Sequence, residues 1–155
     1  MHASGTFMNQ AIVPFDLWKG QVMRITSAVL VAEALAKIPN LTPEEAFHDL
    51  QRGGSTLLDI RETEELALSG SVAGAFHIPR GVLEFAVDPG HPGYRSAITH
   101  DTPLIVMSAG GHRSALATQT LQALGFSHVA NLRGGFRAWV GQGLPIEHPS
   151  VAKTS

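Results

Sequence analysis

The stretch PLIVMSAGGHRSALATQTLQALGF, residues 103–126, decides the predicted fold of this chain. Its first part, PLIVM at 103–107, is a continuous apolar run, which is typical of a strand covered on both faces. Its last part, RSALATQTLQALG at 113–125, places three leucines at helical spacing and ends in a glycine, a residue that commonly terminates helices. The stretch therefore predicts a central strand, a short loop and a helix.

Strands and helices also alternate in the rest of the chain, after a leader at 1–23 that shows no lasting period. Thr42, Pro43 and Glu45 form a capping pattern, which predicts a helix that ends at Gly53-Gly54. This alternation predicts an α/β fold with a mostly parallel sheet and helices on both faces. The other expected elements are strands at 55–60, 74–79 and 128–132, helices at 26–37, 61–70 and 134–143, a helical turn at 80–87, a loop at 88–96 and a helix that resumes near Ala97.

Composition limits the possible functions. The chain has 155 residues, of which 44% are apolar, and this suits one domain with its own core. A net charge of -2 with mixed signs provides no stripe for nucleic acid or an anionic membrane. The longest early apolar run stops at Glu33 and is too short for a membrane span, and no basic segment and small-residue cleavage site frame it as a secretory signal, so we expect a cytoplasmic protein. Because the chain has no cysteine and its eight histidines are scattered, we expect no disulfide, no thiol chemistry, no metal site and no cofactor.

The loop between the predicted central strand and its helix has the features of an anion site. Ser108 stands at the carboxyl end of the strand, where parallel sheets bind ligands. The small residues that follow it expose mainly backbone, and N–H groups above a helix start favour an anion. Arg113 opens the helix, where a cation is unfavourable unless it serves Asp59, Glu62 or a ligand. On the loop alone, a tight turn with a solvated arginine explains the pattern equally well.

Four separated motifs, in their order and spacing, resemble a rhodanese domain over residues 41–147. They are DIRE at 59–62, VAGAFHIPRG at 72–81, SAGGHRSALA at 108–117, and NLRGGFRAW followed by GLPI within 131–146. The resemblance implies a five-stranded parallel sheet flanked by helices on both faces. We expect a leader and helix at 1–40, a rhodanese-like domain at 41–148 and a tail at 149–155.

Rhodaneses transfer sulfane sulfur from thiosulfate or a persulfide to a thiol or cyanide through a loop cysteine. The family loop has a cysteine, four residues and an arginine, so the resemblance places Ser108 at the nucleophile and Arg113 at the end of the loop. A serine hydroxyl forms no persulfide, so we expect no sulfur transfer. We favour a cysteine-to-serine variant of an active enzyme. The alternative is a natural non-catalytic module that recruits a protein partner through its exposed DPGHPGY loop, within 88–96, and its leader.

The length of the loop separates this chain from the related dual-specificity phosphatases. Their anion loop is one residue longer and fits a tetrahedral phosphate, whereas four residues separate Ser108 from Arg113 here. The shorter loop favours sulfur chemistry. Small sulfur anions and a thiol or cyanide are the expected partners, and the resemblance permits a homodimer.

The resemblance also assigns neighbours to the loop. We expect Asp59 and Arg61 to form a buried ion pair beside it, with Arg61 facing the cleft, and Arg80 to line the entrance together with Glu84. We interpret His77 as packed structure. The substrate-binding loop is expected to comprise Ala109, Gly110, Gly111, His112 and Ser114.

Overall fold

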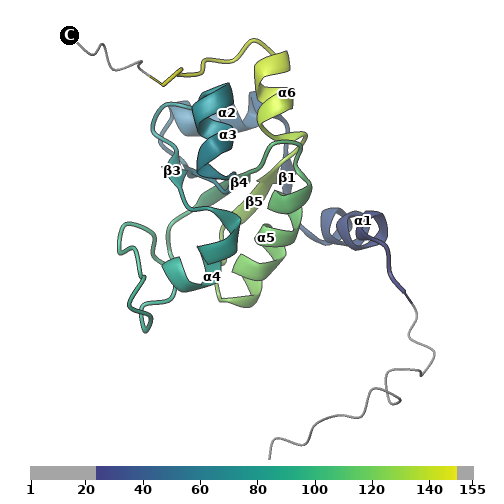
Figure 1. The fold of residues 1–155 in the computed structure, drawn as a ribbon, viewed down its shortest axis with the longest axis vertical. Helices are drawn as coiled ribbons and strands as arrows, with labels where there is room; N and C mark the ends of the chain where they lie inside the picture. Colours follow the sequence, from purple (N-terminus) through teal and green to yellow (C-terminus); the bar gives the residue numbers. More distant parts are fainter. Residues whose placement is uncertain (1–23, 150–155) are drawn as a thin grey trace, which may run out of the picture.

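The computed structural model describes residues 24–149 and shows five parallel strands in the order β1-β5-β4-β2-β3 (Figure 1). All four neighbouring strand pairs are parallel, and β4 is at the centre of the sheet. The predicted α/β fold and the central position of the 103–107 run are confirmed. The predicted leader and most of the predicted tail lie outside the described residues. The strands are β1 (Asn40–Leu41), β2 (Thr56–Asp59), β3 (Phe76–His77), β4 (Leu104–Met107) and β5 (Val129–Leu132).

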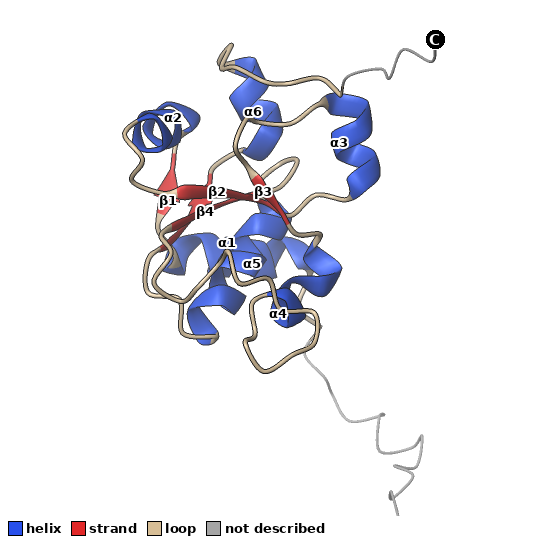
Figure 2. Cartoon of the chain, turned by 90° about the vertical axis from the view of Figure 1, so that its left-hand side faces the viewer, coloured by secondary structure: helices blue, strands red, loops and turns tan. Residues whose placement is uncertain are grey.

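Helices cover both faces of the sheet, as Figure 2 shows. The helical elements are α1 (Ser27–Lys37), α2 (Pro43–Gln51), α3 (Thr63–Ser69), the 3-10 turn η2 (Arg80–Val82), α4 (Leu83–Ala86), α5 (His112–Ala123) and α6 (Gly135–Gly141). The helices α2, α3 and α6 lie on one face, and α1, α4 and α5 lie on the other. Among the described residues, no helix has both the length and the apolar character that crossing a bilayer requires.

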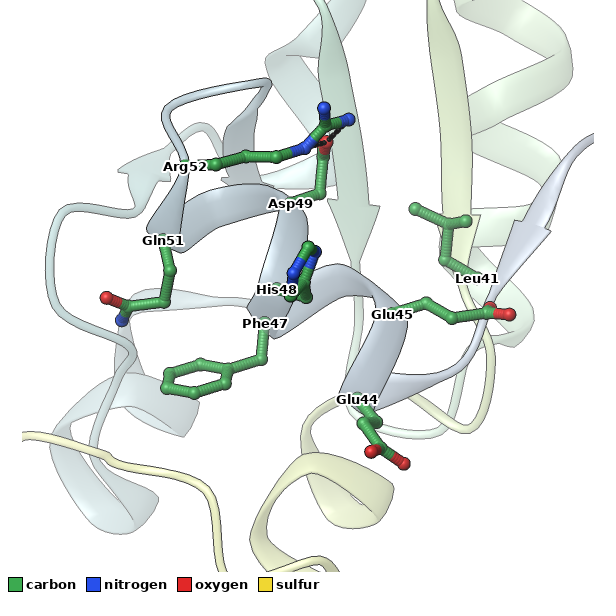
Figure 3. Close-up of a pocket in the computed structure, with 8 residues that line it drawn as sticks. All are labelled: Leu41, Glu44, Glu45, Phe47, His48, Asp49, Gln51 and Arg52. Atoms are coloured by element: carbon green, nitrogen blue, oxygen red, sulfur yellow. Dashed lines mark hydrogen bonds and ion pairs between the residues drawn. The ribbon is translucent and has the colours of Figure 1, made fainter.

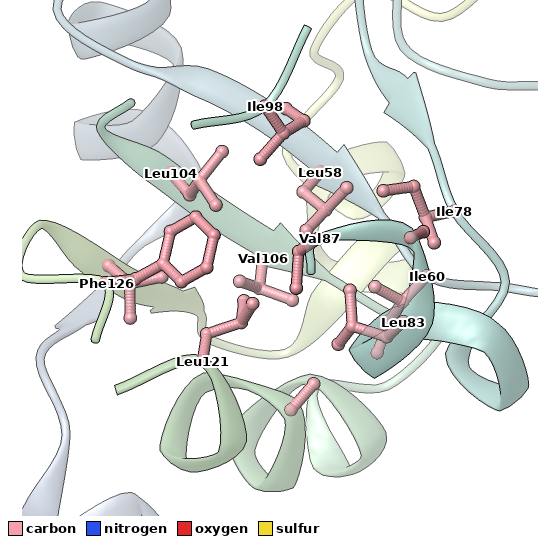
Figure 4. Packing of buried hydrophobic residues seen from close by; sticks show 13 residues of the cluster. Leu58, Ile60, Ile78, Leu83, Val87, Ile98, Leu104, Val106, Leu121 and Phe126 are labelled. Atoms are coloured by element: carbon pink, nitrogen blue, oxygen red, sulfur yellow. The ribbon is translucent and has the colours of Figure 1, made fainter. Parts of the chain in front are cut away.

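The hydrophobic core has one layer on each side of the sheet. All four residues of β4 are buried, and successive side chains of a strand point to opposite faces. Leu104 and Val106 therefore join the cluster beneath α4 and α5, which Figure 4 shows. Ile105 and Met107 join the cluster beneath α2 and α6, which includes Trp139. Because β4 is buried on both faces, its sequence is an unbroken run of apolar residues.

The beginning of α2 follows the predicted capping pattern. The backbone N–H of Glu45 donates to the Thr42 hydroxyl at 3.2 Å, and the Thr42 N–H donates to the Glu45 carboxylate at 2.8 Å. Pro43 occupies the first turn, where a missing N–H leaves no helical hydrogen bond unmade. These contacts satisfy donors that a helix start otherwise leaves without acceptors.

The helix predicted near Ala97 is absent, and turns occupy this part of the chain. The N–H of Ile98 donates to the Arg95 carbonyl at 3.2 Å, and the N–H of Thr102 donates to the Thr99 carbonyl at 3.0 Å. These turns carry Ile98 into the core, where it is 1% exposed. Pro103 follows directly and disfavours a helical conformation at Thr102. The prediction was wrong because burial of one side chain and the proline outweigh local helical preference.

Candidate active-site loop

The loop after β4 lies at the carboxyl edge of the sheet, between the ends of β2 and β5. Its first residue, Ser108, is 1% exposed, and Gly111 is also buried. Ala109 and Gly110 are half-buried, and His112 at the start of α5 is exposed. The serine hydroxyl is therefore enclosed by its own loop.

Backbone amides converge on the hydroxyl of Ser108. The N–H groups of Gly111 and Ser114 donate to Ser108 Oγ at 3.1 and 3.2 Å. Ser108 Oγ in turn donates to Ser114 Oγ at 3.0 Å. Two amide donors aimed at one atom make an environment that favours negative charge at that atom.

The first turn of α6 holds the loop from its other side. The N–H of Phe136 donates to the Ser108 carbonyl at 2.8 Å, and the N–H of Arg137 donates to the Ala109 carbonyl at 3.0 Å. Gly135 permits this approach, because a Cβ atom at this position would lie 2.8 Å from the Ala109 carbonyl oxygen. The two carbonyls thus have backbone partners outside the loop. By contrast, the amides of Ala109, Gly110, His112 and Arg113 have no acceptor within residues 24–149.

Arg113 pairs with Glu65 and not with the expected Asp59 or Glu62. Its guanidinium donates to the two carboxylate oxygens of Glu65 at 2.8 and 2.7 Å. This hydrogen bonding lowers the pKa of Glu65 from 4.5 to about 2 and raises the pKa of Arg113. Glu65 also accepts from the Glu62 N–H at 2.7 Å, so it caps α3 and anchors Arg113 at once. The expected partners were wrong: Asp59 is held by Arg61, and the guanidinium fork of Arg113 meets both oxygens of Glu65 in the first turn of α3.

Arg61 and Asp59 form a buried ion pair, with Arg61 Nη2 2.8 Å from Asp59 Oδ2 and both side chains 1% exposed. Arg61 also donates to the Gly70 carbonyl at 2.9 Å, and its guanidinium carbon lies 3.9 Å from the centre of the Phe136 ring. These contacts direct the arginine into the protein. The expectation that Arg61 faces the cleft was therefore wrong. Its contact with Phe136 supports α6, which binds the loop.

Arg80 and His77 make other contacts. Arg80 Nη1 donates to Glu84 Oε1 at 2.7 Å, and Arg80 Nη2 lies 3.5 Å from the Thr120 hydroxyl, near the far end of α5. His77 Nε2 lies 2.7 Å from the Arg61 carbonyl oxygen, consistent with its interpretation as packed structure. Neither side chain contacts Ser108 through a hydrogen bond. The structure therefore brings Arg61, Asp59 and Ser114 near the loop and gives Arg80 a partner elsewhere.

Sequence reasoning missed Glu65 and the Gly134-Gly135 pair. Glu65 stands three residues after Glu62, and this spacing signals a helix cap but not a partner for a distant arginine. Gly134 and Gly135 both have positive φ values, +74° and +62°, which favour glycine. The double glycine after a strand was the available signal for a close backbone approach.

A surface hollow among the described residues lies away from the loop, along α2. It encloses about 850 Å³ between Leu41 and residues of α2 up to Arg52, as Figure 3 shows. A second hollow of about 590 Å³ lies between α1 and α5 and reaches His112 and Arg113. No residue from 108–111 lines either hollow. The chemistry of the loop, rather than cavity size, identifies the candidate site.

The architecture and the loop match one family of known proteins. The family model for the rhodanese-like domain matches residues 42–142. The chain belongs to the rhodanese-like family. It is 34% identical over 97 residues to a thiosulfate sulfurtransferase GlpE of Stutzerimonas stutzeri (strain A1501), which covers 63% of this chain and 81% of that protein. It is 32% identical over 116 residues to the chloroplastic thiosulfate sulfurtransferase 16 of Arabidopsis thaliana, with 72% and 96% covered.

Solved structures of other proteins share the fold. A protein of unknown function from Rhodopseudomonas palustris CGA009, described as a "Possible Tyrosine Phosphatase", matches with a TM-score of 0.76 and 36% identity, covering 82% of this chain and 98% of that chain. The polysulfide-sulfur transferase homodimer from Wolinella succinogenes matches with a TM-score of 0.64 and 31% identity, covering 80% and 88%. Three of these four similar proteins are named for sulfur transfer, and one is described as a possible tyrosine phosphatase.

Proposed function

We propose that this rhodanese-like chain binds small sulfur anions such as thiosulfate at the loop of residues 108–113. We further propose that it transfers no sulfur, because serine replaces the cysteine nucleophile. The observation that carries the proposal is the convergence of the Gly111 and Ser114 amides on Ser108 Oγ. The same loop also carries the amides of Ala109, Gly110, His112 and Arg113, which have no acceptor within residues 24–149 and suit the charge of a sulfur anion.

A thiolate at position 108 would benefit from the same donors. Backbone N–H groups and a helix N-terminus stabilise the thiolate relative to the thiol, and they lower the pKa of a cysteine below its free value of about 8.5. The thiolate sulfur would attack the outer sulfur of thiosulfate, and the sulfur–sulfur bond would break with its electron pair leaving on sulfite. A thiol or cyanide would then take the outer sulfur and release the thiolate. This cycle needs no metal and no cofactor.

Ser108 cannot carry out the first step. A serine hydroxyl is a weak nucleophile unless a neighbouring base removes its proton. Here the hydroxyl donates to another hydroxyl, that of Ser114, at 3.0 Å. His112 is exposed, and no hydrogen bond joins it to Ser108. The site therefore has the donors for an anion but not the group that forms a persulfide.

The substitution Ser108→Cys tests this proposal. With thiosulfate, the variant should gain about 32 Da, the mass of one sulfur atom, and cyanide should then release thiocyanate. The unchanged chain should show neither result while still binding thiosulfate in a titration followed by NMR of the 108–114 amides. A cysteine variant that forms no persulfide would contradict the proposal. Ser108→Ala is the matched control, because it removes the hydroxyl without adding a thiol.

Two other functions have less support. A protein-recruiting module that uses residues 88–96 does not account for the amides that converge on Ser108. The description of the Rhodopseudomonas palustris relative suggests a phosphatase. The loop of a phosphatase would have five residues before its arginine, whereas four separate Ser108 from Arg113 here. We therefore propose sulfur anions, rather than a phosphate ester, as the ligand of the loop.

A further inference from the structure

Arg137, in the first turn of α6, lies beside the loop. Its backbone N–H donates to the Ala109 carbonyl at 3.0 Å, which fixes the first turn of α6 beside the loop. Its side chain covers Gly110: a Cβ atom added to Gly110 would lie 3.6 Å from Arg137 Nη1, with no other non-neighbouring atom within 4 Å. The guanidinium therefore lies next to Gly110, which is only half-buried.

Among the described residues, Arg137 differs from the two other arginines near the loop in having no anionic partner. Arg61 pairs with Asp59, and Arg113 pairs with Glu65. In the part of the chain that the structure describes, no carboxylate lies within 4.0 Å of the Arg137 guanidinium. The residue is also exposed, so its guanidinium is accessible to an anion from solvent.

We infer that Arg137 recognises the anionic sulfur donor at the mouth of the loop, an inference that rests on the proposed function. The donor class is a small oxyanion that carries a sulfane sulfur, such as thiosulfate. A guanidinium presents paired N–H donors that match two oxygens of such an anion. With the oxygens on Arg137, the sulfane sulfur is free to point toward position 108. Arg137 thus contributes to the specificity for anionic sulfur donors, and it takes no part in breaking or forming sulfur–sulfur bonds.

Gly110 contributes to this arrangement by lacking a side chain. A methyl group at Gly110 would fit between the backbone and Arg137 Nη1 in ordinary van der Waals contact. A longer side chain would displace the guanidinium from the loop or block the approach of an anion. Gly110→Leu should therefore mimic the loss of Arg137 in anion binding while Arg137 itself is retained.

Anion binding by the unchanged Ser108 chain provides the first test. Titration with thiosulfate, followed by calorimetry or amide NMR, should show that Arg137→Gln weakens binding roughly tenfold, the loss expected for one solvent-exposed charge-assisted contact. Arg137→Lys should recover part of that loss. Arg133→Gln is the matched control, because Arg133 is also exposed and precedes the Gly134-Gly135 contact, and it should change the Kd less than about twofold. Equal losses in the two glutamine variants would overturn the assignment.

Steady-state kinetics in a Ser108→Cys background provide the second test. Arg137→Gln should raise KM for thiosulfate about tenfold with kcat nearly unchanged, and discharge of the preformed persulfide to a neutral thiol should keep its rate. A purely structural role would instead lower Tm and slow both half-reactions. If Ser108→Cys forms no persulfide, the proposed function fails. If it forms persulfide with the same KM whether or not Arg137 is present, only the role of Arg137 fails.

Discussion

Glu65 accepts hydrogen bonds from both terminal nitrogens of Arg113, at 2.8 and 2.7 Å, and so joins α3 to the first turn of α5. The two residues are 48 positions apart in the chain. The contact also compensates for a cation placed near the positive end of the α5 dipole. The arginine that ends the loop is therefore held by the protein before any ligand binds.

The pairing predicts that stability depends on pH in the acid range. Arg113 lowers the pKa of Glu65 to about 2 in the folded state, from 4.5. Because the folded pKa is the lower one, the contribution is complete above pH 4.5 and is lost as the pH falls toward 2. Since both side chains are partly exposed, we expect a contribution of only about 1 kcal/mol.

Urea unfolding of Glu65→Gln measures this contribution. At neutral pH the variant should be less stable than the unchanged chain by about 1 kcal/mol, and the difference should disappear near pH 2. Glu64→Gln removes the same charge from the same turn and should change stability much less. A constant difference between the Glu65→Gln variant and the parent across the acid range would show that the ion pair is not its cause.

Asp59→Asn should destabilise the protein strongly. The change leaves Arg61 buried without its counter-ion, and breaking one side of a buried pair costs about 3–5 kcal/mol. The exposed pair of Arg52 and Asp49 is the matched control, because Arg52 is 67% exposed and Arg52→Gln should cost less than about 1 kcal/mol. Chemical denaturation of both variants compares them directly. Similar losses would contradict the assignment of a structural role to the buried pair.

Gly135→Ala should loosen the contact between α6 and the loop. Gly135 has a φ of +62°, and a Cβ atom there would meet the backbone of Ala109 at 2.8 Å. We expect a loss of about 2 kcal/mol or more, because both the backbone conformation and the contact become strained. Gly141→Ala is the control in the same helix, since nothing lies within 4 Å of a Cβ at that position. It should be neutral or stabilising, by up to about 1 kcal/mol. Thermal unfolding measures both changes, and a stable Gly135→Ala variant would contradict the close approach.

The fold was predictable because its signals are local. The unbroken apolar run of β4 and the capping pattern of α2 each depend on a few adjacent residues, and the structure confirms both. The segment around Ala97 was not predictable from local preference, because burial of Ile98 decides its conformation. The strand β3 is also shorter than the predicted 74–79 run.

The candidate site was predictable only in part. The position of Ser108 follows from the strand and the loop motif, which are contiguous in sequence. The partner of Arg113 comes from a helix 48 positions away, and the sequence offers four carboxylates at positions 59–65: Asp59, Glu62, Glu64 and Glu65. The side-chain direction of Arg61 depends on Phe136 and the Gly70 carbonyl, which only the folded chain brings together. Tertiary contacts therefore decide which arginine side chain is buried in an ion pair and which remains available to bind an anion.

Ser114 should tune the acidity of a cysteine placed at position 108. In the present chain Ser114 Oγ accepts from Ser108 Oγ at 3.0 Å, and the Ser114 N–H donates to the same atom at 3.2 Å. Facing a thiolate, the Ser114 hydroxyl would reverse its role and donate, which stabilises the charged form. Removing this donor by Ser114→Ala in a Ser108→Cys background should therefore raise the pKa of the thiol by about 1 unit, the effect of one hydrogen bond to a charged group.

The pH dependence of alkylation by iodoacetamide measures that pKa, because only the thiolate reacts. Thr120→Ala is the matched control, since Thr120 donates to the Leu116 carbonyl within α5 and makes no hydrogen bond to the loop. It should leave the thiol pKa unchanged. Because the backbone donors of Gly111 and residue 114 remain in the Ser114→Ala variant, its thiol should still titrate below the free value of about 8.5. If Ser114→Ala left the alkylation profile unchanged, the thiolate would be stabilised by the backbone amides alone, and the side chain of Ser114 would have no part in it.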